Sequence, residues 1–481
     1  MQHDHSSRGV PVRAGQETTR RTFLRNTLQT GMGLGVTLTI VNGRVQAQET
    51  KKKLGSKPIT LNVWHTEPNP KSQKAFDQIA SDFNKEYPNI TVKQQGMGWG
   101  EHEGQLLASL AAGSPPDISH AIQYVTPSLA AKGLLEPVDD VIHAIGKDDI
   151  FPHIRDVGAW QGDHWYGITH GWGAEILLYR RDWAEKKGLQ EPRTWADYYD
   201  WLKAMNEPPG HYGLALTGTP GFFVNEDVYM FTGENGGGIW KEGGRPNLSN
   251  DHVYGALEHY KKLTEFMSPG WLGHKYVDNL AAIASGKVAC TPTWGRTVGY
   301  IEKYSPDIAD PEHFKPMDFK PVGPMNPGPA ETHMFTQNDG EQWVVYKQGK
   351  NKEAAIEFLK FFFRNENYVK WCDSVPIHIL PIKKSLFNSD EYLNHPERQK
   401  WKFWLETQRK LLENKRVMPL IMNREPDSRI PWLMEVANSG ILPDMVFDVI
   451  DKGKTPQEAT QKAEARINKL IDQVKPTIKK G

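Results

Sequence analysis

The sequence predicts an α/β protein, and three observations support this fold class. The chain has 481 residues, of which 38% are hydrophobic, so it is long enough to bury more than one core. Short runs in which apolar and polar residues alternate are typical of strands, and other segments carry apolar residues at helical spacing. The two kinds of segment follow one another along the chain. This alternation predicts a parallel sheet covered by helices.

The first half of the chain supplies the clearest elements. A strand is predicted over 59–64, because every second residue there is apolar. A helix should follow over about 71–87, where apolar residues recur at helical spacing and Pro88 prevents further turns. A second strand is expected at 90–92, and a second helix at about 103–112.

The second half of the chain continues the same alternation. Strands are expected at 176–179, 288–290 and 343–346. Helices are expected at about 194–205, 250–267 and 276–285, after Asn351, and after Thr455, where Pro456 and Glu458 complete a capping box.

Composition excludes several functional classes. The chain has 58 Lys and Arg against 58 Asp and Glu, which is not the basic balance typical of a nucleic-acid-binding protein. Two cysteines, Cys290 and Cys372, are too few for an all-cysteine zinc site or a scaffold of several disulfides. The sequence leaves open whether they form one bridge, and two buried thiols are slightly favoured.

Residues 1–47 have the pattern of an export signal. Arg20 and Arg21 precede Phe23-Leu24, a weakly apolar stretch follows over 28–41, and Val45-Gln46-Ala47 is a small-residue cleavage site. The paired arginines resemble a twin-arginine signal, which implies export of the folded protein by the twin-arginine translocase. The apolar stretch is shorter than the ~20 residues of a membrane span, and no cysteine offers a lipid anchor. We therefore expect cleavage near Ala47, a flexible lead-in over 48–57 and a periplasmic protein.

Several short segments occur in the order found in one family. The chain resembles the extracellular solute-binding proteins of the sugar-transporter type, which include maltose-binding protein. The segments are Leu61-Asn62-Val63-Trp64, Gly113-Ser114-Pro115-Pro116-Asp117-Ile118, Tyr166-Gly167-Ile168, Leu178-Tyr179-Arg180-Arg181-Asp182, Pro192-Arg193-Thr194-Trp195, Ala282-Ile283-Ala284-Ser285-Gly286-Lys287-Val288-Ala289 and Asn351-Lys352-Glu353-Ala354-Ala355. The chain departs from the family at 338–343 and in a charged, tryptophan-containing addition at 390–409.

The resemblance implies a two-lobed periplasmic-binding-protein fold of type II, with a hinge between the lobes and a ligand cleft between them. Lobe one would hold 58–170 plus 315–375, and lobe two would hold 174–312 plus 378–481. It also implies a monomer that works without a cofactor and delivers its ligand to an inner-membrane ABC permease.

A carbohydrate presents C–H faces and hydroxyl groups, so its site needs flat aromatic rings and a few fixed hydrogen-bonding groups. The loops at predicted strand ends, the first lobe crossing and the stretches after them carry such residues. The predicted ligand-binding residues are His65, Glu67, Trp99, Tyr124, His170, Trp172, Phe222, Trp294, Arg296, Glu341 and Trp343. Because Arg296 is the one obvious cation among them, we expect a neutral sugar, oligosaccharide or polyol.

Three alternatives stay open. A cofactor-free, glycoside-hydrolase-like enzyme is possible in principle, but the chain has none of the C-x-x-C, H-E-x-x-H, G-x-S-x-G or phosphate-loop motifs. Metal binding by His65, His102 and His170 is disfavoured, because these histidines are dispersed in the sequence. A ligand sensor read by a membrane receptor would use the same lobe closure as a transport protein.

Overall fold

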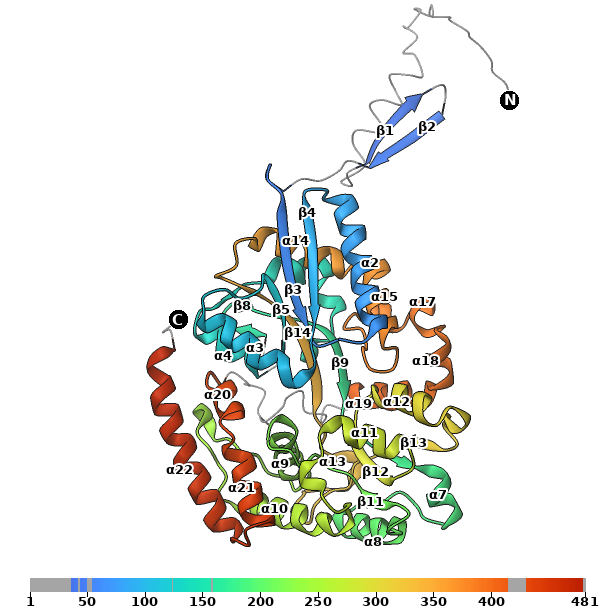
Figure 1. Ribbon diagram of the computed structural model, residues 1–481, viewed down its shortest axis with the longest axis vertical. Coiled ribbons are helices and arrows are strands. Elements are labelled where there is room, and N and C mark those ends of the chain that lie inside the picture. The colour runs from blue at the N-terminus through green and yellow to red at the C-terminus, as the bar shows by residue number, and fades with distance from the viewer. Residues whose placement is uncertain are drawn as a thin grey trace, which may run out of the picture.

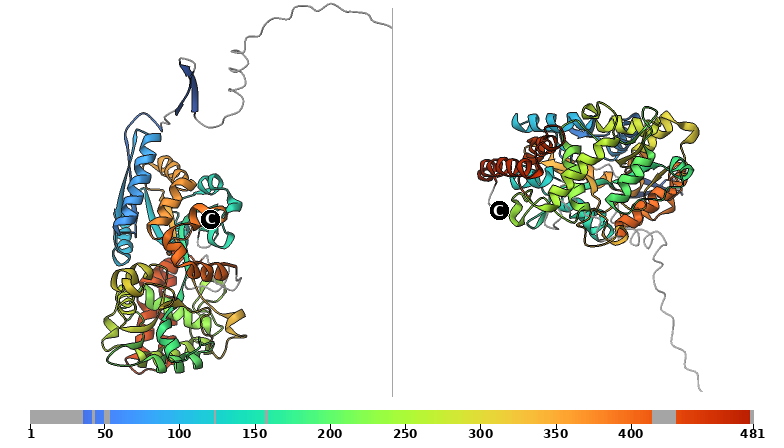
Figure 2. Two further views of the ribbon diagram at one scale, coloured as in Figure 1. Left: turned by 90° about the vertical axis from the view of Figure 1, so that its right-hand side faces the viewer. Right: turned by 90° about the horizontal axis from the view of Figure 1, so that it is seen from below.

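The computed structural model describes residues 36–41, 44–49, 54–122, 124–156, 159–413 and 430–478. Apart from an N-terminal hairpin, the described elements form two groups, one above the other along the longest axis (Figure 1). Each group contains its own sheet with helices packed around it. The side view in Figure 2 shows the same two groups, with β3 and β4 at one side of the upper one.

The upper sheet has the strand order β4-β3-β5-β14-β6, and β9 also pairs with β14. Its strands are β3 Ile59–His65, β4 Ile90–Gly96, β5 Ile118–Ile122, β6 Leu135–Glu136, β9 Ile168–Ala174 and β14 Asn338–Tyr346. Strand β3 runs parallel to β4 and β5, whereas β14 is antiparallel to β5, β6 and β9. The predicted parallel arrangement is confirmed for β3, β4 and β5, whereas the antiparallel direction of β14 was not predicted. The reason is that β14 enters from the lower group, at the end of the sheet where β3 leaves it.

Helices pack around this sheet. They are α2 Pro70–Glu86, α3 Trp99–Ala111, α4 Val125–Ala131, α5 Asp139–Ile145, α6 Pro152–Arg155, α14 Lys352–Phe362 and α15 Asn365–Ser374. The predicted apolar face of α2 is confirmed, because Phe76 and Phe83 are buried and their rings lie 5.7 and 5.3 Å from that of Phe358 on α14. Distant parts of the chain thus build one core, and α2 and α15 lie side by side in Figure 1.

The lower sheet has the order β11-β12-β10-β13. Its strands are β10 Ile176–Arg180, β11 Tyr212–Leu214, β12 Val288–Thr293 and β13 Phe314–Pro316. The surrounding helices are α7 Arg181–Lys186, α8 Trp195–Met205, α9 Phe222–Glu234, α10 Asp251–Leu263, α11 Tyr276–Ala284, α12 Thr297–Tyr304, α13 Ala330–His333, α20 Leu433–Asn438, α21 Ile441–Ile450 and α22 Pro456–Val474. The predicted capping box of Thr455 and Glu458 is confirmed at the start of α22.

Buried polar bonds hold the crossing segments together. Glu175 connects β9 to β10, and its backbone N–H donates to the Gln337 carbonyl, just before β14, at 3.0 Å. Lys320 donates to the Glu175 carboxylate at 2.7 Å. Gln408 accepts from the Ala174 backbone N–H at 2.7 Å and donates to its carbonyl at 3.0 Å. Two crossings and a helix therefore meet at Ala174 and Glu175.

Gln408 belongs to the added segment that the sequence singles out. This segment forms α17 Asp390–Leu393, α18 Pro396–Lys400 and α19 Lys402–Glu413, after α16 Lys384–Phe387. Helix α19 contacts β9 and β13, so the addition braces strands of both sheets.

The remaining strands of the described residues form two hairpins, β1 Val36–Val41 with β2 Arg44–Glu49 and β7 Trp160–Gln161 with β8 His164–Trp165. Residues 1–35, which include the paired arginines, lie outside the described residues, so the export signal stays a prediction. Among the described helices, none is long and apolar enough to span a membrane. Cys290 and Cys372 are both buried free thiols.

Candidate functional site

A cleft of about 1360 Å³ lies where the two groups face each other. The upper group lines it with residues that follow β3 and β5, among them Thr66, Asn69 and Tyr124. The lower group lines it mainly from the first turns of α9, α11 and α12, with Phe222, Phe223, Tyr276, Arg296 and Tyr300. Both groups are therefore needed to form the site.

Aromatic rings form much of the lower wall. Phe223 and Tyr276 are stacked, with ring centroids 4.4 Å apart and an interplanar angle of 16°. Phe222 lies beside Phe223 and reaches Tyr124 of the upper group, at 5.8 Å between centroids. Trp294 is buried and meets Tyr276 edge-on at 5.8 Å. The wall thus offers flat apolar faces that are held from behind by other rings.

One carboxylate projects from the upper wall. Glu103 accepts hydrogen bonds from the Tyr124 hydroxyl at 2.9 Å and from the Asn438 amide at 2.7 Å. Burial raises the pKa of Glu103 above its ordinary value, and the two hydrogen bonds oppose this. Asn438 ends α20, so it adds a third part of the chain to the cleft.

A buried ion pair crosses the base of the cleft. The Arg296 guanidinium, at the start of α12, donates to both oxygens of Glu67, just after β3, at 2.9 and 2.5 Å. Glu67 is fully buried. Burial alone would raise the pKa of Glu67, but Arg296 lowers it below its ordinary value. The pair is therefore ionised, and it ties the upper group to the lower one.

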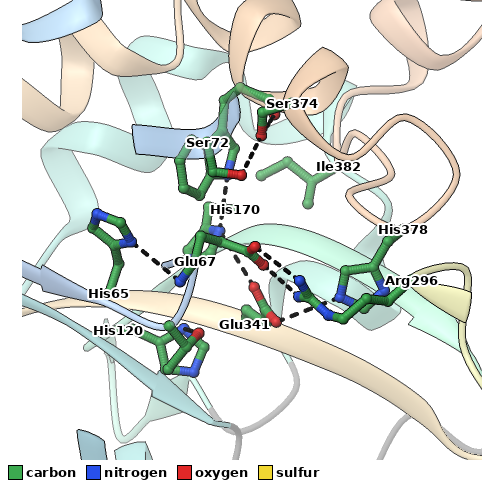
Figure 3. Close-up of polar contacts among 12 residues, drawn as sticks. His65, Glu67, Ser72, His120, His170, Arg296, Glu341, Ser374, His378 and Ile382 are labelled. Carbon is green, nitrogen blue, oxygen red and sulfur yellow. Dashed lines mark hydrogen bonds and ion pairs between the residues drawn. The ribbon is translucent and has the colours of Figure 1, made fainter. Parts of the chain in front are cut away.

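Behind this pair lies a second carboxylate, Glu341, surrounded by histidines (Figure 3). Its oxygens lie 3.9 Å from His170 Nδ1 and 3.8 Å from His378 Nε2. Burial, and then the charge of Glu67, raise the pKa of Glu341 to about 8. Burial lowers the pKa of His120, His170 and His378, so these imidazoles are neutral at pH 7.

The predicted ligand-binding residues divide into three groups. Tyr124, Phe222 and Arg296 line the cleft. Trp172, Trp294 and Glu341 line a separate cavity of about 10 Å³. His65, Glu67, His170 and Trp343 line neither of these two spaces. The side chain of Trp99 lies outside the described residues.

For Trp172 and His65, contacts with the core explain why the side chains lie away from the cleft. Trp172 donates from Nε1 to the Pro381 carbonyl at 2.9 Å and packs on Phe387. His65 stacks on Phe76 at 5.3 Å, within the core. Both therefore help to hold the strands in place.

Several residues of the cleft escape sequence reasoning. Tyr276, Tyr300 and Tyr304 lie on α11 and α12, and Asn438 ends α20. The sequence predicts ligand-binding residues mainly in loops that follow strands, whereas the lower wall is built from the beginnings of helices. The sequence does contain one indication for Tyr276: it is the first residue of the helix predicted over 276–285, and the beginnings of helices line the lower wall.

Two α/β groups joined by several crossings, with a large cleft between them, define a two-lobed periplasmic-binding-protein fold of type II. The family model for bacterial extracellular solute-binding proteins matches residues 78–400. The chain belongs to this family. The fold class and the family expected from the sequence are both confirmed.

Relatives agree with this assignment. YcjN of Escherichia coli (strain K12), provisionally named as an ABC transporter periplasmic-binding protein, is 22% identical over 86% of this chain and 93% of its own. A mannitol-binding protein of Pseudomonas aeruginosa is 27% identical over 44% of this chain and 50% of its own. Among solved structures, an ABC transporter solute-binding protein from Agrobacterium radiobacter K84, in complex with ribitol, matches with a TM-score of 0.72. That match has 22% identity and covers 86% of this chain and 99% of the other.

Proposed function

We propose that the protein is the substrate-binding component of an ABC importer and captures a neutral sugar, oligosaccharide or polyol. The stacked Phe223–Tyr276 pair in the cleft is the observation that carries this proposal. The mannitol-binding relative and the ribitol complex support the same ligand class. Aromatic faces suit the C–H faces of a carbohydrate, and each hydroxyl group needs a partner because an unpaired buried hydroxyl costs about 1–3 kcal/mol.

The charges around the cleft favour a neutral ligand. Its described lining residues include four cations, Lys71, Lys275, Arg296 and Lys303, and three carboxylates, Glu103, Glu302 and Glu397. Arg296 is occupied by Glu67 through two hydrogen bonds, and Lys71 lies 3.3 Å from Glu397. Two of the four cations are therefore paired, and among the described residues Lys275 and Lys303 have no ion pair. A phosphorylated or acidic sugar would call for a larger set of free cations. Hydroxyl groups can use both the donors and the acceptors present.

Capture would proceed by lobe closure around the ligand, and an inner-membrane permease would distinguish the closed from the open form. The lobes proposed are 58–170 plus 315–375 and 174–312 plus 378–481. Because β13 pairs with β10 as far as Pro316, residues 315 and 316 lie in the lower sheet, and we place the second crossing after them rather than at residue 315. The proposal includes export through the twin-arginine translocase, cleavage near Ala47 and action as a periplasmic monomer without catalysis.

A thermal-shift screen of the purified protein tests the ligand class. Neutral sugars and polyols are compared with sugar phosphates and amino acids. A ligand that binds only the folded protein raises its melting temperature, by an amount that grows with concentration. We expect a shift with at least one neutral carbohydrate. Shifts with amino acids or sugar phosphates alone would contradict the proposal, and so would conversion of the carbohydrate, which mass spectrometry of the same samples detects.

Phe223→Ala should weaken carbohydrate binding at least 10-fold, as measured by isothermal titration calorimetry. The substitution removes one face of the stacked pair, and stacking contributes about 0.5–1.5 kcal/mol beyond the apolar area it buries. Phe223 is only partly buried, so the protein should stay folded. The matched control is Leu272→Ala, since Leu272 is 41% exposed and does not line the cleft. Equal affinities in the two variants would remove Phe223 from the site.

A further inference from the structure

Three neighbouring strands of the upper sheet bring two histidines and a carboxylate together. His120 lies on β5, His170 on β9 and Glu341 on β14, and β14 pairs with both other strands. One ring nitrogen of each histidine and one oxygen of Glu341 all lie within 4.8 Å of one another. Figure 3 shows the three side chains next to each other, with a dashed contact between His170 and Glu341. The positions are fixed by strands, which hold a site more rigidly than loops.

A β-bulge places His170 in this group. Gly171 pairs with Glu341 and Thr169 pairs with Gln342, so His170 is the extra residue between two paired positions. Bulges change the direction of a side chain and are common beside functional sites. The His170 ring consequently stacks on Trp343, two residues beyond Glu341 on the same strand, at 4.2 Å between centroids.

The group has bonding capacity that the described residues leave unused. Neither oxygen of Glu341 accepts a hydrogen bond from the described part of the chain, although the residue is 4% exposed. His170 Nε2 is likewise buried without a hydrogen-bond partner among the described residues. A buried polar group without a partner is costly, and the cost is higher for a charged one. The charge of Arg296 opposes the rise in the pKa of Glu341, but the hydrogen bonds that its guanidinium donates go to Glu67.

We propose that His120, His170 and Glu341 bind one divalent cation of the zinc type. Two imidazoles and one carboxylate are a known ligand set for Zn²⁺, with open positions left for water. Around such an ion, ligand atoms at ~2.0–2.1 Å lie about 3.4 Å from one another. The potential ligand atoms lie within 4.8 Å of one another, so the widest separation would shorten by at most about 1.4 Å on binding. Imidazole nitrogens disfavour Mg²⁺ and Ca²⁺, which prefer oxygen ligands.

Neighbouring groups support and also limit this site. The Thr66 hydroxyl lies 3.3 Å from His120 Nδ1 and can orient that ring. Trp371 donates from its indole nitrogen to His170 Nδ1 at 3.2 Å. A neutral imidazole that binds a metal has one nitrogen on the ion and a proton on the other. If Nδ1 binds the ion, or if Nε2 binds it and Nδ1 carries the proton, Nδ1 can no longer accept the hydrogen bond from Trp371. The Trp371 hydrogen bond therefore competes with the ion.

A second grouping, Glu67 with Glu341 and His378, is less suitable. Its potential ligand atoms also lie within 4.8 Å of one another. However, both Glu67 oxygens already accept hydrogen bonds from Arg296, whose positive charge would repel a cation. The proposal therefore assigns the ion to the His120 side of Glu341.

Calorimetry on protein stripped with a chelator tests the site without any carbohydrate, so its failure is distinguishable from failure of the proposed function. We expect one Zn²⁺ per chain, a higher melting temperature and, with Co²⁺ as the probe, visible absorption bands. Mg²⁺ should produce no heat of binding. Absence of saturable Zn²⁺ and Co²⁺ binding would overturn the proposal.

Variants locate the ion. Glu341→Gln and His170→Gln should each weaken Co²⁺ binding at least 10-fold, whereas His164→Gln should not change it, because His164 pairs with Asp139 on the surface. Glu341→Gln keeps the shape of the side chain and removes no hydrogen bond of the Glu341 carboxyl oxygens among the described residues, so this variant should fold as well as the parent. Trp371→Phe removes the competing donor and should tighten binding in the folded variant. Unchanged affinity in Glu341→Gln and His170→Gln would overturn the assignment.

Discussion

Arg296→Met should lower the free energy of unfolding by about 3–5 kcal/mol, because it leaves the Glu67 carboxylate buried without its partner. Glu67 is fully buried, and its ionised form depends on the guanidinium. The variant should also lose carbohydrate binding, since Arg296 lines the cleft and joins its two sides. Urea denaturation measures the first effect and calorimetry measures the second.

The double variant Glu67→Gln/Arg296→Met distinguishes the interaction between the two charges from the other contacts that each side chain makes. Removing both charges should restore most of the lost stability, because no buried charge is left unpaired. Arg466→Met is the matched control: Arg466 lies 2.6 Å from Asp444, but both side chains are at least 40% exposed. Its effect should stay within about 0.5–1 kcal/mol. A double variant with the summed losses of its single variants would contradict a coupled pair.

Lys320→Met should have an effect of similar size, about 3–5 kcal/mol at pH 8. Lys320 is buried and lies 2.7 Å from Glu175 and 3.2 Å from Glu234. Without its ammonium group, two buried carboxylates would face each other at the crossing between the sheets. Urea denaturation of the variant and the parent measures the loss.

The loss should depend on pH. Burial already raises the pKa of Glu234 from 4.5 to about 7, although Lys320 opposes the shift. A carboxyl group with a raised pKa in the folded state binds its proton more tightly there, so stability falls as pH rises from 4.5 toward the folded pKa. Removing Lys320 raises that pKa further. The destabilisation should therefore be larger at pH 8 than at pH 5, and a loss independent of pH would contradict this account.

Lys402→Met is the control for this series. Lys402 lies 3.8 Å from Glu406, and both side chains are more than half exposed. An exposed pair in water contributes little, so the change should be below about 1 kcal/mol at either pH. Lys402 thus represents an exposed pair with a single carboxylate, whereas Lys320 is buried between two carboxylates.

Local patterns predicted much of the fold. The alternation of Ile59, Leu61 and Val63 identified β3, and the capping box at Thr455 identified the start of α22. These features depend on a few adjacent residues, which the sequence displays directly. The direction of a strand within its sheet, in contrast, could not be predicted from local patterns. Strand β14 is antiparallel because of where the chain re-enters the upper sheet, and nothing in residues 338–346 records that path.

The site was harder to predict than the fold. Tyr124, Phe222 and Arg296 were identified as candidates and line the cleft, because they follow recognisable elements. Trp172 was expected there because it is aromatic and lies in the first lobe crossing, yet its indole donates to the Pro381 carbonyl in the core. In a sequence, a tryptophan that packs in the core looks the same as a tryptophan that binds a ligand. Only three-dimensional packing distinguishes the two.

The buried Glu341 shows a further limit. Its sequence context, between Gly340 and Gln342, gives no sign that His120 and His170 lie beside it. They come together because β14 lies between β5 and β9 and because a bulge turns His170 toward the same face. Of the three histidines weighed as metal ligands from the sequence, His65, His102 and His170, only His170 belongs to this cluster.

The central claim is that the cleft captures a neutral carbohydrate. A crystal structure of the protein with the carbohydrate that gives the largest thermal shift tests this claim most directly. We expect the intact ligand in the cleft, with a ring or carbon-chain face on the Phe223–Tyr276 pair and hydroxyl groups near Tyr124 and Glu103. A carbohydrate bound outside the cleft, or one cleaved within it, would contradict the account.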